Sequence, residues 1–212
     1  MADFERLSES VIKGEEEKVK ELVQEAIDDG LEPSEIINQG LISGMNVVGK
    51  RFKEGDMFVP EVLLSARSMK GGMELVKPLL VEGDMEEAGK VLLGTVEGDL
   101  HDIGKNLVGM MMESGGLEVI NLGTDVTAEE FAEAVREHKP DVLGMSALLT
   151  TTMLEMQNTI EVLIEEGLRD TVKIIVGGAP VTKEFADEIG ADGWAPDAAS
   201  AKDLVFELAE VN

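Results

Sequence analysis

Apolar positions in the first 80 residues recur at helical spacing. Phe4, Leu7 and Val11 form a first stripe, and apolar residues return three or four positions apart in 19–27, 37–52 and 62–76. This spacing places them on one face of a helix. The pattern therefore predicts four helices joined by short loops, which pack as a helical bundle.

Glycine and proline mark the ends of these predicted helices. Gly30 and Gly55 stand where a helix commonly ends in a left-handed residue. Pro60 lies near the first turn of the fourth helix, where its missing N–H is harmless. Gly40 and Gly44 fall inside the third helix, where glycine lowers stability unless a neighbouring backbone packs closely. We therefore expect such a close contact at these two glycines.

From Val91 onward, short continuous apolar runs alternate with helical patterns. Such runs are typical of parallel strands covered on both faces. The predicted strands span residues 91–96, 117–122, 141–146, 173–177 and 193–195. The predicted helices span residues 105–114, 127–138, 151–167, 182–189 and 198–210. This alternation predicts a doubly wound, five-stranded parallel sheet in a Rossmann-like α/β domain.

The segment 81–90 separates the two patterns. It is acidic, contains glycine and has no strong apolar stripe. We therefore predict a helical cap domain at residues 1–80, a linker at 81–90 and an α/β domain at 91–212.

The composition is that of a globular protein with a strong negative charge. Hydrophobic residues make up 43% of the chain and charged residues 29%, as in ordinary soluble domains. The 44 acidic residues against 18 Lys and Arg give a formal charge of −26, which repels phosphate backbones. We therefore expect no nucleic-acid partner. The acidity indicates solubility or, alternatively, a field that steers a basic partner.

The sequence also favours the cytoplasm. It contains no cysteine, which excludes disulfide and thiol chemistry and is consistent with a reducing compartment. Its first residues have neither the basic nor the apolar region of a signal peptide. No apolar run approaches the length of a membrane span, so we expect no membrane partner.

A histidine with two neighbouring aspartates follows the first predicted strand. Asp99, His101 and Asp102 lie at the carboxyl edge of the predicted sheet, where open α/β folds bind ligands. Imidazole is a common metal ligand, and Asp99 could accept its other ring N–H. Because one histidine makes a poor zinc site, a metal at His101 should arrive with most ligands supplied by a cofactor. Alternatively, His101 is an ordinary loop residue, Asp102 a helix cap and Gly104 a packing position.

Two further motifs end later strands. Ser146 and Leu148 form a Ser-x-Leu string after the third strand, and Gly177 and Gly178 follow the fourth. Together with the earlier Asp-x-His-x-x-Gly string, this ordered set resembles the signature of cobalamin-binding domains. The resemblance covers roughly residues 89–212.

The segment 55–70 extends the resemblance, because it is similar to the cap of methyl-carrying corrinoid proteins. The bundle and the cobalamin domain together resemble the stand-alone corrinoid subunits of methyltransferase systems. The same two modules occur in cobalamin-dependent methionine synthase. The resemblance implies a cobalamin or related cobamide in its methyl-cobalt form, held base-off, with a protein histidine in place of the tail base.

The resemblance also implies roles for individual residues. His101 would be the axial cobalt ligand, and Asp99 and Ser146 would continue a hydrogen-bonded relay. Phe58 and Met69 either belong to the bundle core or cover the upper cobalt face. Threonines 150–152 either reach the cofactor tail or cap the next helix. The cofactor-binding set in the α/β domain is Asp99, His101, Asp102, Ile103, Gly104, Ser146, Leu148, Thr150, Gly177 and Gly178, of which Gly104, Leu148, Gly177 and Gly178 would line the tail slot.

The function that the resemblance implies is a methyl shuttle, with the chemistry supplied by the cofactor. The expected partners are a substrate-specific corrinoid methyltransferase, a second methyltransferase serving a tetrahydrofolate-type or thiol acceptor, and a reductive activase. We expect no turnover by the chain alone. The alternatives are a mutase subunit, which needs no helical cap, and a cobalamin-based sensor, which would carry a DNA-binding module. A phospho-receiver with Asp99 or Asp141 would leave the histidine and glycine motifs unexplained.

Overall fold

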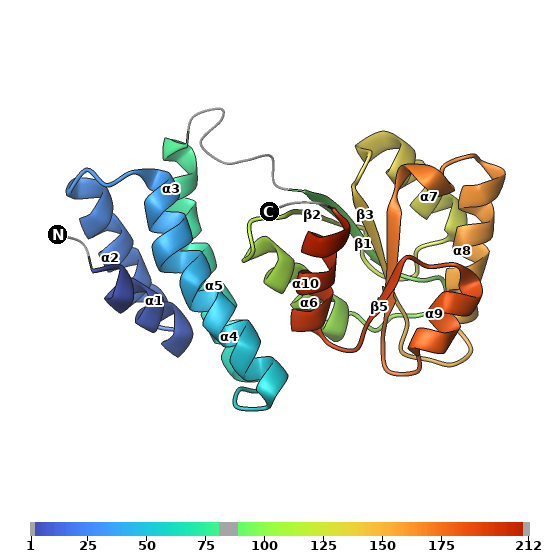
Figure 1. The fold of residues 1–212 in the computed structure, drawn as a ribbon, viewed down its shortest axis with the longest axis horizontal. Coiled ribbons are helices and arrows are strands. Elements are labelled where there is room, and N and C mark those ends of the chain that lie inside the picture. The colour runs from blue at the N-terminus through green and yellow to red at the C-terminus, as the bar shows by residue number, and fades with distance from the viewer. Residues whose placement is uncertain (1–2, 81–88, 210–212) are drawn as a thin grey trace. The chain divides into compact units, whose positions relative to one another are not determined.

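The computed structural model describes residues 3–80 and 89–209. These residues form two compact units, one helical and one α/β (Figure 1). Most of the predicted linker at 81–90 lies outside the described residues, and its last residue, Lys90, begins the first strand. Within the described ranges, no helix is long and apolar enough to cross a membrane.

The helical unit confirms the four predicted helices. Its elements are α1 (Phe4–Lys13), α2 (Glu16–Asp28), α3 (Pro33–Glu35), the π-helical η1 (Ile36–Ile42), α4 (Ser43–Glu54), α5 (Val59–Val76) and the 3₁₀ turn η2 (Lys77–Leu79). The third predicted helix corresponds to α3, η1 and α4 in succession. Most residues of the predicted apolar stripes are buried, including Leu7, Val11, Val23, Leu41 and Val62, whereas Phe4 and Phe52 are only partly buried.

The third helix packs against α1 at its two glycines. A β-carbon on Gly40 would lie 2.4 Å from Leu7 Cδ2, and one on Gly44 would lie 2.9 Å from the carbonyl oxygen of Ser8. The expected close backbone contact is therefore confirmed at Gly44, whereas the close neighbour of Gly40 is the Leu7 side chain. The π-helical turns of η1 were not predicted, because their apolar residues follow the same spacing as an α-helix and π turns are rare.

The α/β unit confirms the predicted sheet. Its strands are β1 (Lys90–Thr95), β2 (Glu118–Asn121), β3 (Val142–Ser146), β4 (Lys173–Gly177) and β5 (Gly193–Ala195). All are parallel, in the order β2-β1-β3-β4-β5. The remaining elements are α6 (Ile103–Glu113), α7 (Ala128–His138), α8 (Leu154–Glu165), the 3₁₀ turn η3 (Arg169–Thr171), α9 (Lys183–Ile189) and α10 (Ala198–Leu208).

Alternating side chains bury both faces of this sheet. Leu92 and Leu143 belong to one apolar core with residues of α7, α8 and α9. Leu93 and Val142 belong to a second core with residues of α6 and α10. Figure 1 shows these two groups of helices on opposite sides of the strands. The period-two alternation of a strand produces this two-sided burial.

The sheet order creates a switch point between β1 and β3. These strands are neighbours, but α6 follows β1 on one face and α8 follows β3 on the other. The loops after the two strands therefore diverge at the carboxyl edge. In doubly wound folds, ligands bind at this position.

We predict that Gly44→Ala destabilises the helical unit by about 1–3 kcal/mol, because the new methyl group overpacks against backbone. This loss exceeds the gain of about 1 kcal/mol that comes from the higher helix propensity of alanine. Gly71→Ala is the control, because its nearest neighbour is the Cε atom of Lys20, a flexible side chain. Urea unfolding followed by far-UV circular dichroism should show the loss. The fluorescence transition of the single tryptophan, Trp194 in the α/β unit, should stay unchanged. Equal stability of the two variants would contradict the prediction.

Candidate functional site

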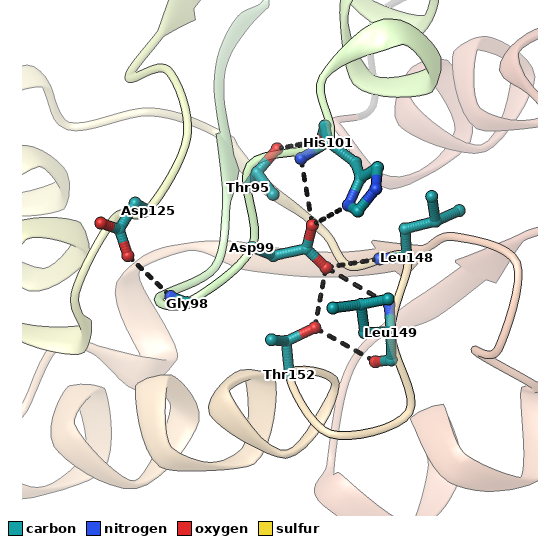
Figure 2. Close-up of polar contacts among 8 residues, drawn as sticks. All are labelled: Thr95, Gly98, Asp99, His101, Asp125, Leu148, Leu149 and Thr152. Carbon is teal, nitrogen blue, oxygen red and sulfur yellow. Dashed lines mark hydrogen bonds and ion pairs between the residues drawn. The ribbon is translucent and has the colours of Figure 1, made fainter.

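The loop from Val96 to Asp102, between β1 and α6, holds the predicted histidine at the switch point. Its turn is closed by the N–H of Asp99, which donates to the Val96 carbonyl at 3.2 Å, and Gly98 supplies a left-handed residue at φ 75°. The Asp99 side chain is fully buried. Figure 2 shows its carboxylate between His101 and the segment that follows β3.

The Asp99 carboxylate accepts hydrogen bonds on both oxygens. Oδ1 accepts from the backbone N–H of His101 at 3.1 Å and from its ring Nδ1 at 2.7 Å. Oδ2 accepts from the N–H groups of Leu148 and Leu149 at 2.8 and 3.3 Å and from the Thr152 hydroxyl at 2.7 Å (Figure 2). One carboxylate thus ties the loop after β1 to the loop after β3.

These donors keep Asp99 ionised despite its burial. Burial alone would raise the pKa of the Asp99 carboxyl. The hydrogen bonds from Leu148, Thr152 and His101 outweigh burial and lower this pKa well below its usual range. At neutral pH the carboxylate therefore only accepts hydrogen bonds.

The ionised carboxylate assigns the tautomer of His101. Because Asp99 can only accept, the proton of the neutral ring lies on Nδ1, and Nε2 keeps its lone pair. The side chain is 52% exposed. Its backbone is held as well, since the Thr95 hydroxyl donates to the His101 carbonyl at 3.0 Å. The imidazole is therefore anchored at one nitrogen and open at the other, the arrangement of a metal ligand with a carboxylate partner.

Exposed apolar side chains from the same two loops accompany this imidazole. Leu100, Ile103, Leu148 and Leu149 are between 42% and 76% exposed. A β-carbon on Gly104 would meet no atom within 4 Å. Several large apolar side chains exposed on adjoining loops indicate a binding surface for a partly apolar ligand.

Ser146 does not occupy its predicted place in the relay. The hydroxyl on Asp99 belongs to Thr152, whereas Ser146 ends β3, paired with Thr95 and Gly177. After β3 the chain turns, with the Thr152 N–H donating to the Leu149 carbonyl at 3.2 Å, and this turn places the Thr152 hydroxyl on the carboxylate. The predicted contact between Ser146 and Asp99 is therefore wrong. A contact of Ser146 with the cofactor stays a prediction.

The threonine run has a different role from the predicted helix cap. The residue preceding α8 is Met153, and no side chain caps this helix start. Thr152 binds Asp99 instead, and Thr150 is exposed in the turn before it. The predicted contact of Thr150 with a cofactor tail stays a prediction.

Gly177 and Gly178 allow a close backbone approach at the sheet edge. Gly178 has φ 127°, and a β-carbon on it would lie 1.9 Å from the carbonyl oxygen of Ala147. A β-carbon on Gly177 would lie 3.1 Å from the carbonyl oxygen of Ala195. Any larger residue at 178 would therefore displace the loop that leads to Leu148. That these glycines also line a tail slot stays a prediction.

The structure separates the two residues predicted in the helical unit. Met69 lies in α5 and is 2% exposed, so it is a core residue and has no surface with which to cover a cofactor. Phe58 precedes α5 and is 67% exposed, so the alternative that it belongs to the core is wrong. Its N–H donates to Glu61 Oε2 at 2.9 Å, which fixes the start of the helix. The covering role stays a prediction for Phe58 alone.

Comparison with known protein families identifies both units. A B12 binding domain model matches residues 89–202, and a second B12 binding domain model matches residues 3–77. The chain belongs to the cobalamin-binding corrinoid proteins of methyltransferase systems. This family membership confirms the resemblance seen in the sequence.

Similar corrinoid proteins match over nearly the full length. A corrinoid protein of Desulfitobacterium hafniense is 46% identical, covering 98% of each chain. The dimethylamine corrinoid protein of Methanosarcina barkeri is 45% identical, covering 97% of this chain and 96% of that one. In the crystal structure of the methanol:cobalamin methyltransferase complex of Methanosarcina barkeri, a chain 34% identical superimposes with a TM-score of 0.86. The match covers 99% of this chain and 80% of that one.

The site of this corrinoid protein fits a cobamide. A single imidazole donor suits a metal whose other positions are filled by a macrocycle. The exposed leucines and isoleucine suit the apolar parts of that macrocycle, and the space beside Gly104 leaves room for it. Among the described residues, no group of three or more His, Asp or Glu could hold a metal ion.

Other members of this site were not predicted from the sequence. Thr152 was singled out only as a tail contact or a helix cap. Asp125 accepts from the Gly98 N–H at 2.7 Å, and it has a positive φ of 58°. Lys105 is buried beside the loop and donates to Asn121. Lys105 is the first residue of the helix predicted at 105–114, directly after the Asp-x-His-x-x-Gly string, and this position was the available signal.

We predict that Asp99→Asn destabilises the α/β unit by about 2 kcal/mol at pH 7, the scale of hydrogen bonds to a charged group. Folding lowers the pKa of Asp99. The Asp99 carboxylate therefore stabilises the fold fully at pH values above its pKa in the unfolded chain, about 4. This stabilisation is lost as the pH falls below that value. Urea unfolding followed by Trp194 fluorescence should show a gap between parent and variant that narrows from pH 5 to pH 3. The exposed Asp170→Asn serves as the control, and a gap that widens in acid would refute this account.

Proposed function

We propose that this chain carries a methyl group on the cobalt of a cobamide, with His101 Nε2 as the axial ligand. The observation that carries the proposal is the His101 ring, fixed at Nδ1 by a buried carboxylate and exposed at its other side. When bound, the cobamide supplies the cobalt that accepts and releases the methyl group. The chain supplies ligation, orientation and shielding.

The cofactor tail would lie within the α/β unit. His101 would hold the metal in place of the tail base, and the tail would then be free to lie in a slot. Gly104, Leu148, Gly177 and Gly178 are the residues we assign to the slot. Two features support this assignment. Gly104 borders open space, and Gly177 and Gly178 allow the backbone to approach its neighbours closely at the adjoining edge of the sheet.

With the buried carboxylate at its Nδ1, His101 could hold either cobalt or a proton at Nε2. When the demand for an axial ligand falls, Nε2 is free to take a proton. An ionised carboxylate 2.7 Å from Nδ1 favours the resulting imidazolium. The donors from Leu148 and Thr152 keep the charge on Asp99 throughout. The Thr152–Asp99–His101 chain is thus a relay that stabilises the protonated ring.

Phe58 is our candidate for shielding the upper face of the cofactor. The residue is 67% exposed at the start of α5, which leaves its ring accessible to a bound group. A methyl group on the metal needs in-line access to enter and leave. The shield must therefore move aside when a partner enzyme docks.

The partner proposed as methyl source is a substrate-specific corrinoid methyltransferase. Relatives named dimethylamine and trimethylamine corrinoid proteins are 45% and 40% identical to this chain, which favours a methylated amine as the original donor. We further propose a second methyltransferase that uses a tetrahydrofolate-type or thiol acceptor. A reductive activase would restore the cofactor after accidental oxidation.

We predict that His101→Ala removes the imidazole nitrogen coupling from the electron paramagnetic resonance spectrum of the Co(II) form. Parent protein loaded with cobalamin should show this coupling. The variant should also bind cobalamin more weakly, because it lacks the ligand. His138→Ala, at the end of α7, is the control and should keep the parent spectrum. Retention of the coupling in His101→Ala would overturn the ligation.

We predict that Asp99→Asn makes Co(II)/Co(I) reduction less pH-dependent, and that Thr152→Val does the same by a smaller amount. Both changes reduce the charge stabilisation that supports a protonated His101. Ser146→Ala is the comparison variant, because it removes the hydroxyl that ends β3 and does not contact Asp99. The measurement is the midpoint potential between pH 6 and pH 9. If Ser146→Ala changes the slope and Thr152→Val leaves it unaltered, the relay runs through Ser146 instead.

A further inference from the structure

A buried lysine lies next to the histidine loop without a role in the function proposed above. Lys105, in the first turn of α6, is 4% exposed. Its Nζ donates to Asn121 Oδ1 at 2.6 Å and to Asn106 Oδ1 at 2.9 Å, both neutral oxygens. Burial lowers the pKa of Lys105, and the charge of nearby Asp102 partly opposes that shift. Burying an ammonium group is costly unless its hydrogen bonds are all made.

The bonds around Lys105 connect the start of α6 with the end of β2. Asn121 Nδ2 donates to Asn106 Oδ1 at 3.1 Å, and Asn106 Nδ2 donates to Asp102 Oδ2 at 2.9 Å. Asn121 Oδ1 also accepts from the Gly123 N–H at 3.0 Å. The network therefore reaches from the residue next to His101 to the segment after β2.

The same segment holds the other end of the histidine loop. Asp125 Oδ1 accepts from the Gly98 N–H at 2.7 Å (Figure 2), and the Asp125 N–H donates to the Asp99 carbonyl at 3.0 Å. Asp125 makes these contacts from a left-handed conformation with φ 58°, which is strained for a residue other than glycine. We call residues 121–126 the clasp, since they hold the loop at both ends.

We propose that Lys105 is a positioning residue that fastens the histidine loop to the clasp through Asn121, so that His101 stands in its ligand position before any cofactor binds. A loop fixed in advance binds faster and loses less conformational entropy on binding. The proposal rests on the proposed function for what His101 binds. The fastening itself is a property of the chain without cofactor.

The decisive experiment is amide hydrogen exchange on the cofactor-free full chain. In Lys105→Met, the amides of Gly98 and His101 should exchange about ten- to hundred-fold faster, the factor that corresponds to losing a hydrogen bond to a charged group. Amides within β3 should keep the parent rate. Lys90→Met is the matched control, because Lys90 is a part-buried lysine at the start of β1 whose Nζ donates to the His138 carbonyl at 3.3 Å. It should leave the two loop amides unchanged.

A second variant guards against a general loss of folding. Asn121→Leu removes the acceptor and keeps the lysine, and it should loosen the same two amides. If the contact between Lys105 and Asn121 is responsible, the two amides in the Lys105→Met/Asn121→Leu double variant should exchange no faster than in the faster of the two single variants. Parent-like exchange in both single variants, or additive effects in the double variant, would overturn the proposal.

Cobalamin uptake supplies the functional readout. Association of hydroxocobalamin should slow about ten-fold in Lys105→Met, and the Co(II) spectrum should show the parent imidazole coupling once the cofactor is bound. Uptake at the parent rate would overturn the positioning role. If parent protein takes up no cobalamin, the proposed function fails, and the exchange data still decide whether Lys105 fastens the loop.

Discussion

The site depends on keeping one negative charge inside the α/β unit. A buried carboxylate is stable only when donors surround it, and Asp99 finds them in its own loop and in the loop after β3. This requirement holds two segments together that lie about fifty residues apart in sequence. It also aims the imidazole outward, since the ring must turn its Nδ1 toward the charge.

Much of this arrangement follows from local sequence. Apolar runs locate the strands and helices, because burial on two faces leaves a continuous pattern. The spacing of Asp99 and His101 predicts their contact, since residues two apart in a turn can meet. Gly40 and Gly44 indicate a close contact between helices, because glycine inside a helix is otherwise unfavourable.

The rest depends on long-range geometry that no local pattern encodes. Ser146 and Thr152 are both hydroxyl residues after the same strand, and the path of the turn decides which one reaches Asp99. Phe58 and Met69 both belong to segment 55–70, but Phe58 precedes α5 in an extended conformation and is exposed, whereas Met69 lies on the buried face of the helix. Lys105 has the sequence signature of a solvated helix residue, and its burial follows from the nearby end of β2. Costly features of this kind, a buried ammonium and a left-handed aspartate, gather around functional loops.

The backbone contact at Gly178 has a consequence for the proposed cofactor site. Its Cα lies against the peptide of Ala147, and the next residue, Leu148, donates its N–H to Asp99. A group inserted at this edge therefore acts on the carboxylate through a single peptide unit, and from there on the imidazole. The coupling free energy between two sites is the same in both directions. Under the proposed function, a stronger hold on the tail at Gly178 would change how firmly Asp99 holds the His101 ring, and a change of ligand at His101 would in turn change the hold on the tail. The two ends of the cofactor would then be allosterically coupled.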